Sequence, residues 1–482
     1  MTKTMHATTA GQRINRLNPE QSRQIHEASL KILERTGVCL YEPEAVELMK
    51  KAGADVRDGN RVRIPSKLVE RALATAPRQI TIYDRCGQPA MEVGGYNFYC
   101  GPGSDCLHIV DHRTGQRRQP TLNDVVEGIT LCDALENIDY VMSMFLPGEV
   151  NQAIADRYQM EVMLSRTTKP VVFVTYDMSG CADAIEMAEA VAGGAAALEA
   201  RPFVACYINV TTGLRHNPEA LQKLLYLAGR GLPALYIPVT GAGTTGPMTV
   251  AGTLAMNNAG GLAGVVLAQL KREGAPVIVP GWGGESLDMS TLVDPYCGAE
   301  QRGVAEALAH LNNLPMFSLA GCTDAKVVDQ QAAIEAAITL MVDIYSGGNI
   351  IHDLGYLESG LCGSLAQLAI CDEIVEWIKR SSTELEINDE TLALDLIDEA
   401  GPDGEYLSTE HTLSHFRGRW YPRLLERWNY EDWVAHGSQT LGERAAGRVE
   451  AVLAAHRPAP LPGSAAQALR AIVERAEAQN RE

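Results

Sequence analysis

The residues of this sequence most able to do chemistry lie just after short apolar runs. Trp282 follows one such run, and His352, Asp353 and Tyr356 follow another. Aromatic faces attract cations, a histidine can hydrogen-bond a carboxylate, and an aspartate can balance a positive charge. Together these residue types indicate a site for a small polar molecule.

Six runs of this kind recur, and their regular spacing predicts the elements that carry the polar residues. The runs begin near residues 171, 203, 234, 277, 316 and 349. Each is too short for a helix and ends in glycine, threonine, asparagine or an aromatic residue, as a buried strand does before its loop. The intervening stretches are rich in alanine and leucine and are helix-like. This alternation is the pattern of repeated βα units.

Two more strands complete the count. The segments 96–105 and 140–145 precede the six runs, and helices are expected within 121–135, 154–167, 181–199, 217–230, 249–273, 297–312, 328–346 and 364–380. Eight strands and eight helices predict a (β/α)8 TIM barrel over residues 95–380. Residues 1–94 are expected to form an N-terminal helical cap with a β-rich lead-in, and residues 381–482 a C-terminal helical extension. Chemistry in such barrels occurs at the carboxyl ends of the strands.

Composition limits the partners and the compartment. The 482 residues include 41 basic and 60 acidic side chains, for a formal net charge of −19. This charge disfavours nucleic acids and anionic membranes and mildly favours cationic small molecules. Eleven cysteines without C-x-x-C spacing indicate reduced thiols in a cytoplasmic protein. The apolar stretch 248–270 is long enough to cross a membrane, but its central Asn257-Asn258 favours a buried helix.

Four separated motifs stand out in the chain. They are Gly101-Pro-Gly-Ser-Asp105, Ala320-Gly-Cys-Thr-Asp-Ala-Lys-Val-Val-Asp329, His352-Asp-Leu-Gly-Tyr-Leu-Glu358, and His411-Thr-Leu-Ser-His-Phe-Arg417 with Trp420 and Pro422. In this order they resemble the trimethylamine methyltransferase family, whose members move a methyl group from methylamines to a corrinoid protein. The resemblance spans nearly the whole chain. Founding members of the family carry pyrrolysine, which this sequence lacks, so it resembles the non-pyrrolysine branch that includes glycine betaine enzymes.

The resemblance implies a methyltransferase that moves a methyl group from a quaternary amine to the Co(I) of a partner corrinoid protein. The partner would carry the corrinoid, so no tightly bound cofactor, metal or catalytic side chain is expected in this chain. The residues expected to bind substrate are Tyr96, Tyr99, Asn209, Trp282, His352 and Tyr356. Those expected to balance the ammonium charge are Asp105, Glu285, Asp324 and Asp353. The protein is also expected to be a homo-oligomer.

Two other functions remain open from the residues alone. One is a different barrel enzyme, such as a lyase that uses Lys326 as a Schiff-base lysine, or a metal enzyme. Lys169 and Cys322 could also act as nucleophiles, and Cys322, His352 and Cys362 could converge on zinc. The other is a non-catalytic betaine sensor on an enzyme fold. The sequence does not identify which quaternary amine would be bound.

Overall fold

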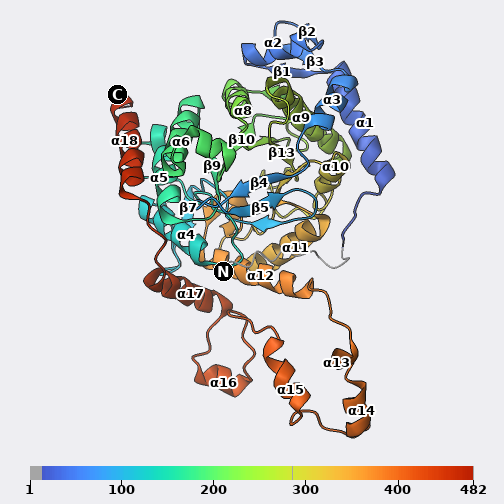
Figure 1. Ribbon diagram of the computed structural model, residues 1–482, viewed down its shortest axis with the longest axis vertical. Helices are drawn as coiled ribbons and strands as arrows, with labels where there is room; N and C mark the ends of the chain where they lie inside the picture. Colours follow the sequence, from blue (N-terminus) through green and yellow to red (C-terminus); the bar gives the residue numbers. More distant parts are fainter. Residues whose placement is uncertain (1–12, 285, 481–482) are drawn as a thin grey trace.

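The computed structural model describes residues 13–284 and 286–480 and is built around a curled sheet of seven parallel strands (Figure 1). In sheet order these are β6 (Tyr99–Cys100), β15 (Ile350–His352), β14 (Met316–Leu319), β13 (Val277–Pro280), β12 (Ala234–Pro238), β10 (Val204–Val210) and β9 (Val171–Val174). All neighbouring pairs run parallel. This sheet confirms the predicted mixed α/β, TIM-barrel class.

The eighth position of the barrel is filled by an irregular segment rather than by the strand predicted at 140–145. Asp139 N–H donates to Cys100 O at 2.7 Å on one side, and Val172 N–H donates to Val141 O at 2.9 Å on the other. These bonds join the segment to both edge strands of the sheet. Met144 within it has φ of 59°, which interrupts regular pairing.

Helices surround the sheet on its outer side (Figure 1). They are α4 (Leu122–Ala134), α5 (Ala155–Arg166), α6 (Met178–Ala192), α7 (Ala195–Ala200), α8 (Pro218–Arg230), α9 (Val250–Lys271), α10 (Ala305–Leu311), α11 (Gln330–Ser346) and α12 (Leu365–Ser381). Most lie within the predicted ranges. Two expectations differ more from the structure. The helix expected at 181–199 is divided into α6, which begins at Met178, and α7, and the helix expected at 297–312 is helical only in its second half, because residues 286–304 form a loop.

The α9 helix contains the apolar stretch that could be mistaken for a membrane span. It is the one helix among the described residues that is long and apolar enough to cross a membrane. Its most apolar part is largely buried, and the helix packs against α1 (Pro19–Arg35), α3 (Ser66–Thr75) and α8. This packing agrees with the buried helix expected from Asn257-Asn258.

The N-terminal region adds helices and two small sheets. The α1 helix begins with a capping box, in which Asn18 accepts the N–H of Gln21 and the Gln21 side chain accepts the N–H of Asn18. Together with α2 (Pro43–Lys51) and α3 it covers a sheet of β1 (Val38–Leu40), β2 (Asp55–Arg57), β3 (Arg61–Arg63) and β11 (Arg215–His216). The hairpin of β4 (Ile80–Tyr83) and β5 (Pro89–Val93) packs on the barrel interior near the starts of the strands.

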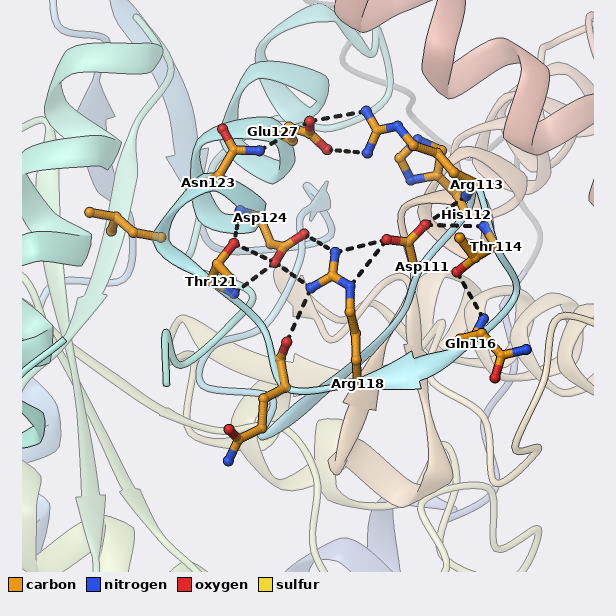
Figure 2. Close-up of polar contacts among 12 residues, drawn as sticks. Asp111, His112, Arg113, Thr114, Gln116, Arg118, Thr121, Asn123, Asp124 and Glu127 are labelled. Atoms are coloured by element: carbon orange, nitrogen blue, oxygen red, sulfur yellow. Dashed lines mark hydrogen bonds and ion pairs between the residues drawn. The ribbon is translucent and has the colours of Figure 1, made fainter. Parts of the chain in front are cut away.

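A second four-stranded sheet lies beside the carboxyl ends of the barrel strands. Its order is β16 (Tyr356–Leu357), β17 (Cys362–Gly363), β7 (His108–Val110) and β8 (Arg117–Arg118), and residues 111–116 connect β7 and β8 as a hairpin. Figure 2 shows Arg118 between Asp111 and Asp124, at 2.8 and 2.7 Å. Because Asp124 lies in the first turn of α4, these ion pairs fix the sheet that carries Tyr356 to the barrel wall.

The C-terminal region has two parts. The α17 (Leu441–Ala455) and α18 (Gly463–Gln479) helices return to the barrel and pack on α12, α4, α5 and α6. Before them, α13 (Asp389–Leu392), α14 (Leu394–Ala400), α15 (Glu410–His415) and α16 (Tyr430–Ala435) project away from the barrel (Figure 1). The α13 and α14 helices are separated at Ala393, which has φ of 51°.

Candidate functional site

The carboxyl ends of the barrel strands surround a cavity of about 290 Å³. Six of the residues predicted for the site line this cavity: Asp105, Asn209, Trp282, His352, Asp353 and Tyr356. They lie at or after the ends of β6, β10, β13 and β15, and the parallel strands bring them together because all their carboxyl ends meet at one edge of the sheet.

Aromatic rings form one wall of the cavity. The His352 ring stacks on Phe317, with centroids 3.9 Å apart and planes inclined by 18°. The Trp282 and Tyr207 rings lie close to this pair, with centroids 5.1 and 6.1 Å from the His352 centroid. Rings held this close by a buried strand keep fixed orientations, so they present a rigid face to any bound molecule.

The hydrogen bonding of His352 fixes its protonation. Its Nδ1 lies 2.6 Å from the carbonyl oxygen of Ser318, so Nδ1 carries the hydrogen and donates it. Burial lowers the pKa of His352 to about 3, and the imidazole is neutral at pH 7. Its Nε2 is therefore an acceptor and cannot donate to a carboxylate of a ligand, which was the role expected from the sequence.

Asp353 is the most strongly perturbed carboxyl group of the cavity. Burial raises the pKa of Asp353 to about 8, against the opposing field of Arg302. The residue has φ of 76°, an uncommon conformation outside glycine. Gly103 makes room for it, because a Cβ atom there would lie 1.9 Å from Asp353 Oδ1 and 2.6 Å from the Tyr356 ring.

Asp105 lies in the loop that follows β6, the strand next to β15, and is held by neutral donors. Its Oδ1 accepts from Gln159 Nε2 at 2.8 Å and from Ser143 Oγ at 3.3 Å. Burial raises the pKa of Asp105 as well. With Asp294 and Asp353, it gives the cavity three carboxyl groups, and no lysine or arginine is among the described residues that line it. The site is therefore suited to a cation.

Comparison with known protein families identifies the chain. The family described as trimethylamine methyltransferase matches residues 2–480. The chain belongs to the trimethylamine methyltransferase family.

Individual relatives of the family differ in their named substrate. A trimethylamine methyltransferase MttB of Desulfitobacterium hafniense (strain DCB-2) is 32% identical over 463 residues, covering 95% of this chain and 93% of the relative. A glycine betaine methyltransferase of strain Y51 is 30% identical over 457 residues, covering 93% and 94%. The monomethylamine methyltransferase of Methanosarcina barkeri superposes with a TM-score of 0.49 at 10% identity, covering 97% of this chain and 89% of that one. The relatives are named methyltransferases, and this chain is an enzyme of their kind.

The structure places three of the predicted site residues outside the lining of the cavity. Tyr96 stacks on His310 near the amino-terminal end of the strands, and Tyr99 lies inside the barrel, where its hydroxyl accepts the N–H of Glu92. Both residues lie before or at the start of β6, whereas the cavity is at the other end of the strands. Asp324 lies behind the cavity wall. Glu285 is outside the described residues.

Asp324 holds a loop in place rather than facing the cavity. Its carboxylate accepts the N–H groups of Tyr296 and Cys297, at 2.9 and 3.1 Å, and the hydroxyl of Ser359 at 2.8 Å. These bonds position the loop 286–304, which brings Asp294 and Tyr296 into the cavity lining. Asp324 therefore supports two lining residues that the sequence did not indicate.

The residues that the sequence offered as nucleophiles for other reactions, Lys326, Lys169 and Cys322, do not line the cavity. Lys326 is exposed and its Nζ donates to Asp324 O, while Lys169 Nζ donates to the carbonyls of Cys132, Leu135 and Ile138. Cys322 is buried, and burial raises its pKa. Among the described residues the one group with metal-ligand spacing is Cys297, Asp324 and Glu335. Its two carboxylates already accept backbone N–H groups.

Proposed function

We propose that this enzyme transfers a methyl group from a quaternary amine, such as glycine betaine, to the Co(I) of a partner corrinoid protein. The observation that carries the proposal is the composition of the cavity, which combines aromatic faces with carboxyl groups and has no lysine or arginine in its described lining. A permanent cation without N–H groups suits such a surface, because it gains from π-faces and from negative charge without needing a hydrogen-bond acceptor.

The reaction does not require the protein to act as a general acid or a general base. The C–N bond of the methyl group breaks, its electron pair stays on nitrogen, and a neutral tertiary amine leaves without needing a proton. The corrinoid of the partner supplies the nucleophile that accepts the methyl group. The cavity residues bind the ammonium group, orient one methyl towards the open end of the barrel and exclude water. This division of work fits a cavity in which no activated nucleophile of the chain is present among the described lining residues.

The two ends of a betaine would contact different groups. The trimethylammonium end suits the aromatic rings of Tyr207, Trp282 and Tyr356 together with the Asp353 carboxylate. Asn209 follows Tyr207 by two residues on β10, so both side chains face the cavity. Its amide can donate to the carboxylate end, a role that neutral His352 cannot fill. We also infer a cytoplasmic location, since all eleven cysteines are free thiols.

Methyl transfer to free cob(I)alamin tests the proposal. Incubation of the enzyme with cob(I)alamin and glycine betaine should give methylated cobalamin and dimethylglycine in equal amounts. Tight binding of betaine without methylated cobalamin would contradict the proposal and indicate a sensor.

Replacement of Trp282 should weaken substrate binding. If the indole supplies one face of the ammonium site, Trp282→Ala should weaken the binding of glycine betaine by about 0.5–2 kcal/mol, the range of one cation–π contact. Isothermal titration calorimetry measures the change. Trp377→Ala is the matched control, because Trp377 is exposed on α12, outside the cavity lining, and its loss should leave betaine affinity unchanged. Equal affinity of wild type and a folded Trp282→Ala variant would remove Trp282 from the site.

A methyl group added at Gly103 should also damage the site. The new Cβ would overlap Asp353 Oδ1 and the Tyr356 ring, so Gly103→Ala should displace both residues at a cost of about 1–3 kcal/mol in stability. We expect betaine binding to be lost in the folded fraction, as measured by calorimetry at a temperature below the melting transition. Gly447→Ala is the control, because no atom lies within 4 Å of a Cβ at that position. Betaine affinity that survives in Gly103→Ala would contradict the placement of Asp353 at the substrate.

A further inference from the structure

The segment 383–440, which we call the arm, leaves the barrel without forming a core of its own. It contains α13 to α16 and projects away from the rest of the molecule (Figure 1). Leu424 is the only residue of this described segment that is buried. Ordering so many residues costs conformational entropy that burial of apolar surface normally offsets. Within one chain that burial is missing.

The arm is nevertheless rich in apolar side chains. Of the 29 large hydrophobic side chains that are exposed among the described residues, 14 lie in the arm. They include Leu385, Ile387 and Leu407, which are 81%, 73% and 84% exposed. A concentration of exposed apolar residues in one segment marks a surface that another protein surface covers.

Charge divides the arm into two halves. Residues 384–410 contain ten aspartates and glutamates and no lysine or arginine. Residues 417–427 contain four arginines and one glutamate. The arginines Arg417, Arg419 and Arg423 join Arg380 around a hollow of about 360 Å³ at the base of the arm. Glu376, which forms an ion pair with Arg380, is the one acidic residue in its described lining, so the hollow keeps an excess of positive charge. The arm thus carries an acidic segment, residues 384–410, and a basic segment, residues 417–427. The basic segment lines the hollow.

We propose that the arm pairs two copies of this chain around a two-fold axis, with the acidic segment of each copy against the basic hollow of the other. A two-fold interface uses the same surface on both subunits, so it must be self-complementary, and a surface with one acidic and one basic half meets this condition. The apolar side chains between the charges become buried in the same step. Because the whole chain has a net charge of −19, a local basic segment is needed for two copies to approach.

The position of the arm favours a second copy over the methyl-accepting partner. The arm begins after α12, whose last residues contact Tyr345 at the end of α11, and Arg423 forms an ion pair with Glu136, which follows α4. The ends of barrel helices lie at the amino-terminal end of the strands. The cavity opens at the other end, where the methyl acceptor must approach. The arm is therefore free to join two subunits, independently of the proposed methyl transfer.

Two charge-reversal variants test the pairing. One carries Asp395→Lys, Asp398→Lys and Glu399→Lys, and the other carries Arg417→Glu, Arg419→Glu and Arg427→Glu. All six side chains are exposed. Sedimentation velocity at low salt should give wild type a mass of at least two chains and each variant alone half of the wild-type mass. Since one variant has two basic halves and the other two acidic halves, an equal mixture should recover the wild-type mass.

A control separates the arm from net charge. Lys31→Glu, Lys50→Glu and Lys67→Glu make the same charge change as the arginine variant, on exposed residues of the N-terminal helices, and should leave the mass unchanged. Circular dichroism should show the wild-type helical spectrum for all variants, because the arm contributes little to the core of one subunit. The proposal is overturned if wild type has the mass of one chain, if either arm variant keeps the wild-type mass, or if the mixture stays at half mass.

Discussion

Glycine betaine should lose a methyl group to cob(I)alamin at least about 100-fold faster than dimethylglycine or trimethylamine, a difference of about 2.7 kcal/mol in the barrier. A quaternary amine reacts by expelling a neutral tertiary amine. A tertiary amine enters the cavity as an ammonium ion, and its N–H can donate to the Asp353 carboxylate. This hydrogen bond holds the protonated amine with its N–H, rather than its methyl groups, towards the carboxylate. The small neutral fraction of the amine is not attracted by the aromatic wall, and its leaving group would be an amide anion.

The named relatives make this result informative. The chain is 32% identical to a trimethylamine methyltransferase and 30% identical to a glycine betaine methyltransferase, so membership of the family does not choose between the two substrates. Initial rates with 1 mM of each amine, followed by the cobalamin spectrum, compare them directly. Tetramethylammonium is the control for the carboxylate of betaine, because it is a quaternary amine that has no carboxylate. Turnover of trimethylamine at a rate near that of betaine would contradict both the quaternary-amine proposal and the assignment to the non-pyrrolysine branch.

The barrel was predictable because each strand has a pattern of its own. Buried parallel strands appear as short apolar runs, and the ranges expected for α5, α8 and α11 agree with the structure within a few residues. The failure at 140–145 has a local cause. Tyr140 is fully buried, its hydroxyl donates to Ile351 O, and its ring lies where Gly101 leaves room for it. An apolar pattern does not reveal that the chain must bend to place this ring.

The site was predictable where a residue lies near the carboxyl end of its strand or in the first residues after it. Trp282, His352, Asp353 and Asn209 were found because strand ends meet at one edge of the barrel. Tyr96 and Tyr99 were misplaced because the run near residue 96 was read from its start rather than from its carboxyl end. The sequence also contains a signal for Tyr207. It lies two residues before Asn209 on one strand, so the two side chains face the same side. Tyr296 carries none, because a distant carboxylate, Asp324, positions its loop.

Betaine binding should strengthen about tenfold for each pH unit between pH 6 and pH 8 and then level off. In the empty cavity burial raises the pKa of Asp353 to about 8, so the carboxyl group is mostly protonated at pH 6. A bound cation favours the carboxylate, so binding releases a proton, and the cost of that release disappears as pH rises through the pKa of the empty site. His352, with a pKa of about 3, does not titrate in this range. Calorimetry in two buffers of different ionisation enthalpy measures the proton release directly.

Asp353→Asn separates this carboxyl group from its neighbours. Burial also raises the pKa of Asp105 and of Asp294, so either could contribute to the pH dependence of wild type. The amide cannot ionise, and its affinity for betaine should be nearly constant from pH 6 to pH 8. At pH 8 it should be about 30-fold or more weaker than wild type, since loss of one member of a buried charge pair costs about 2 kcal/mol or more. The isostere 3,3-dimethylbutanoate is the control ligand, because it has the shape and the carboxylate of betaine without the ammonium charge and should bind wild type no more tightly at pH 8 than at pH 6. A wild-type affinity for betaine that does not change over this range would show that Asp353 is not the counter-charge of the substrate.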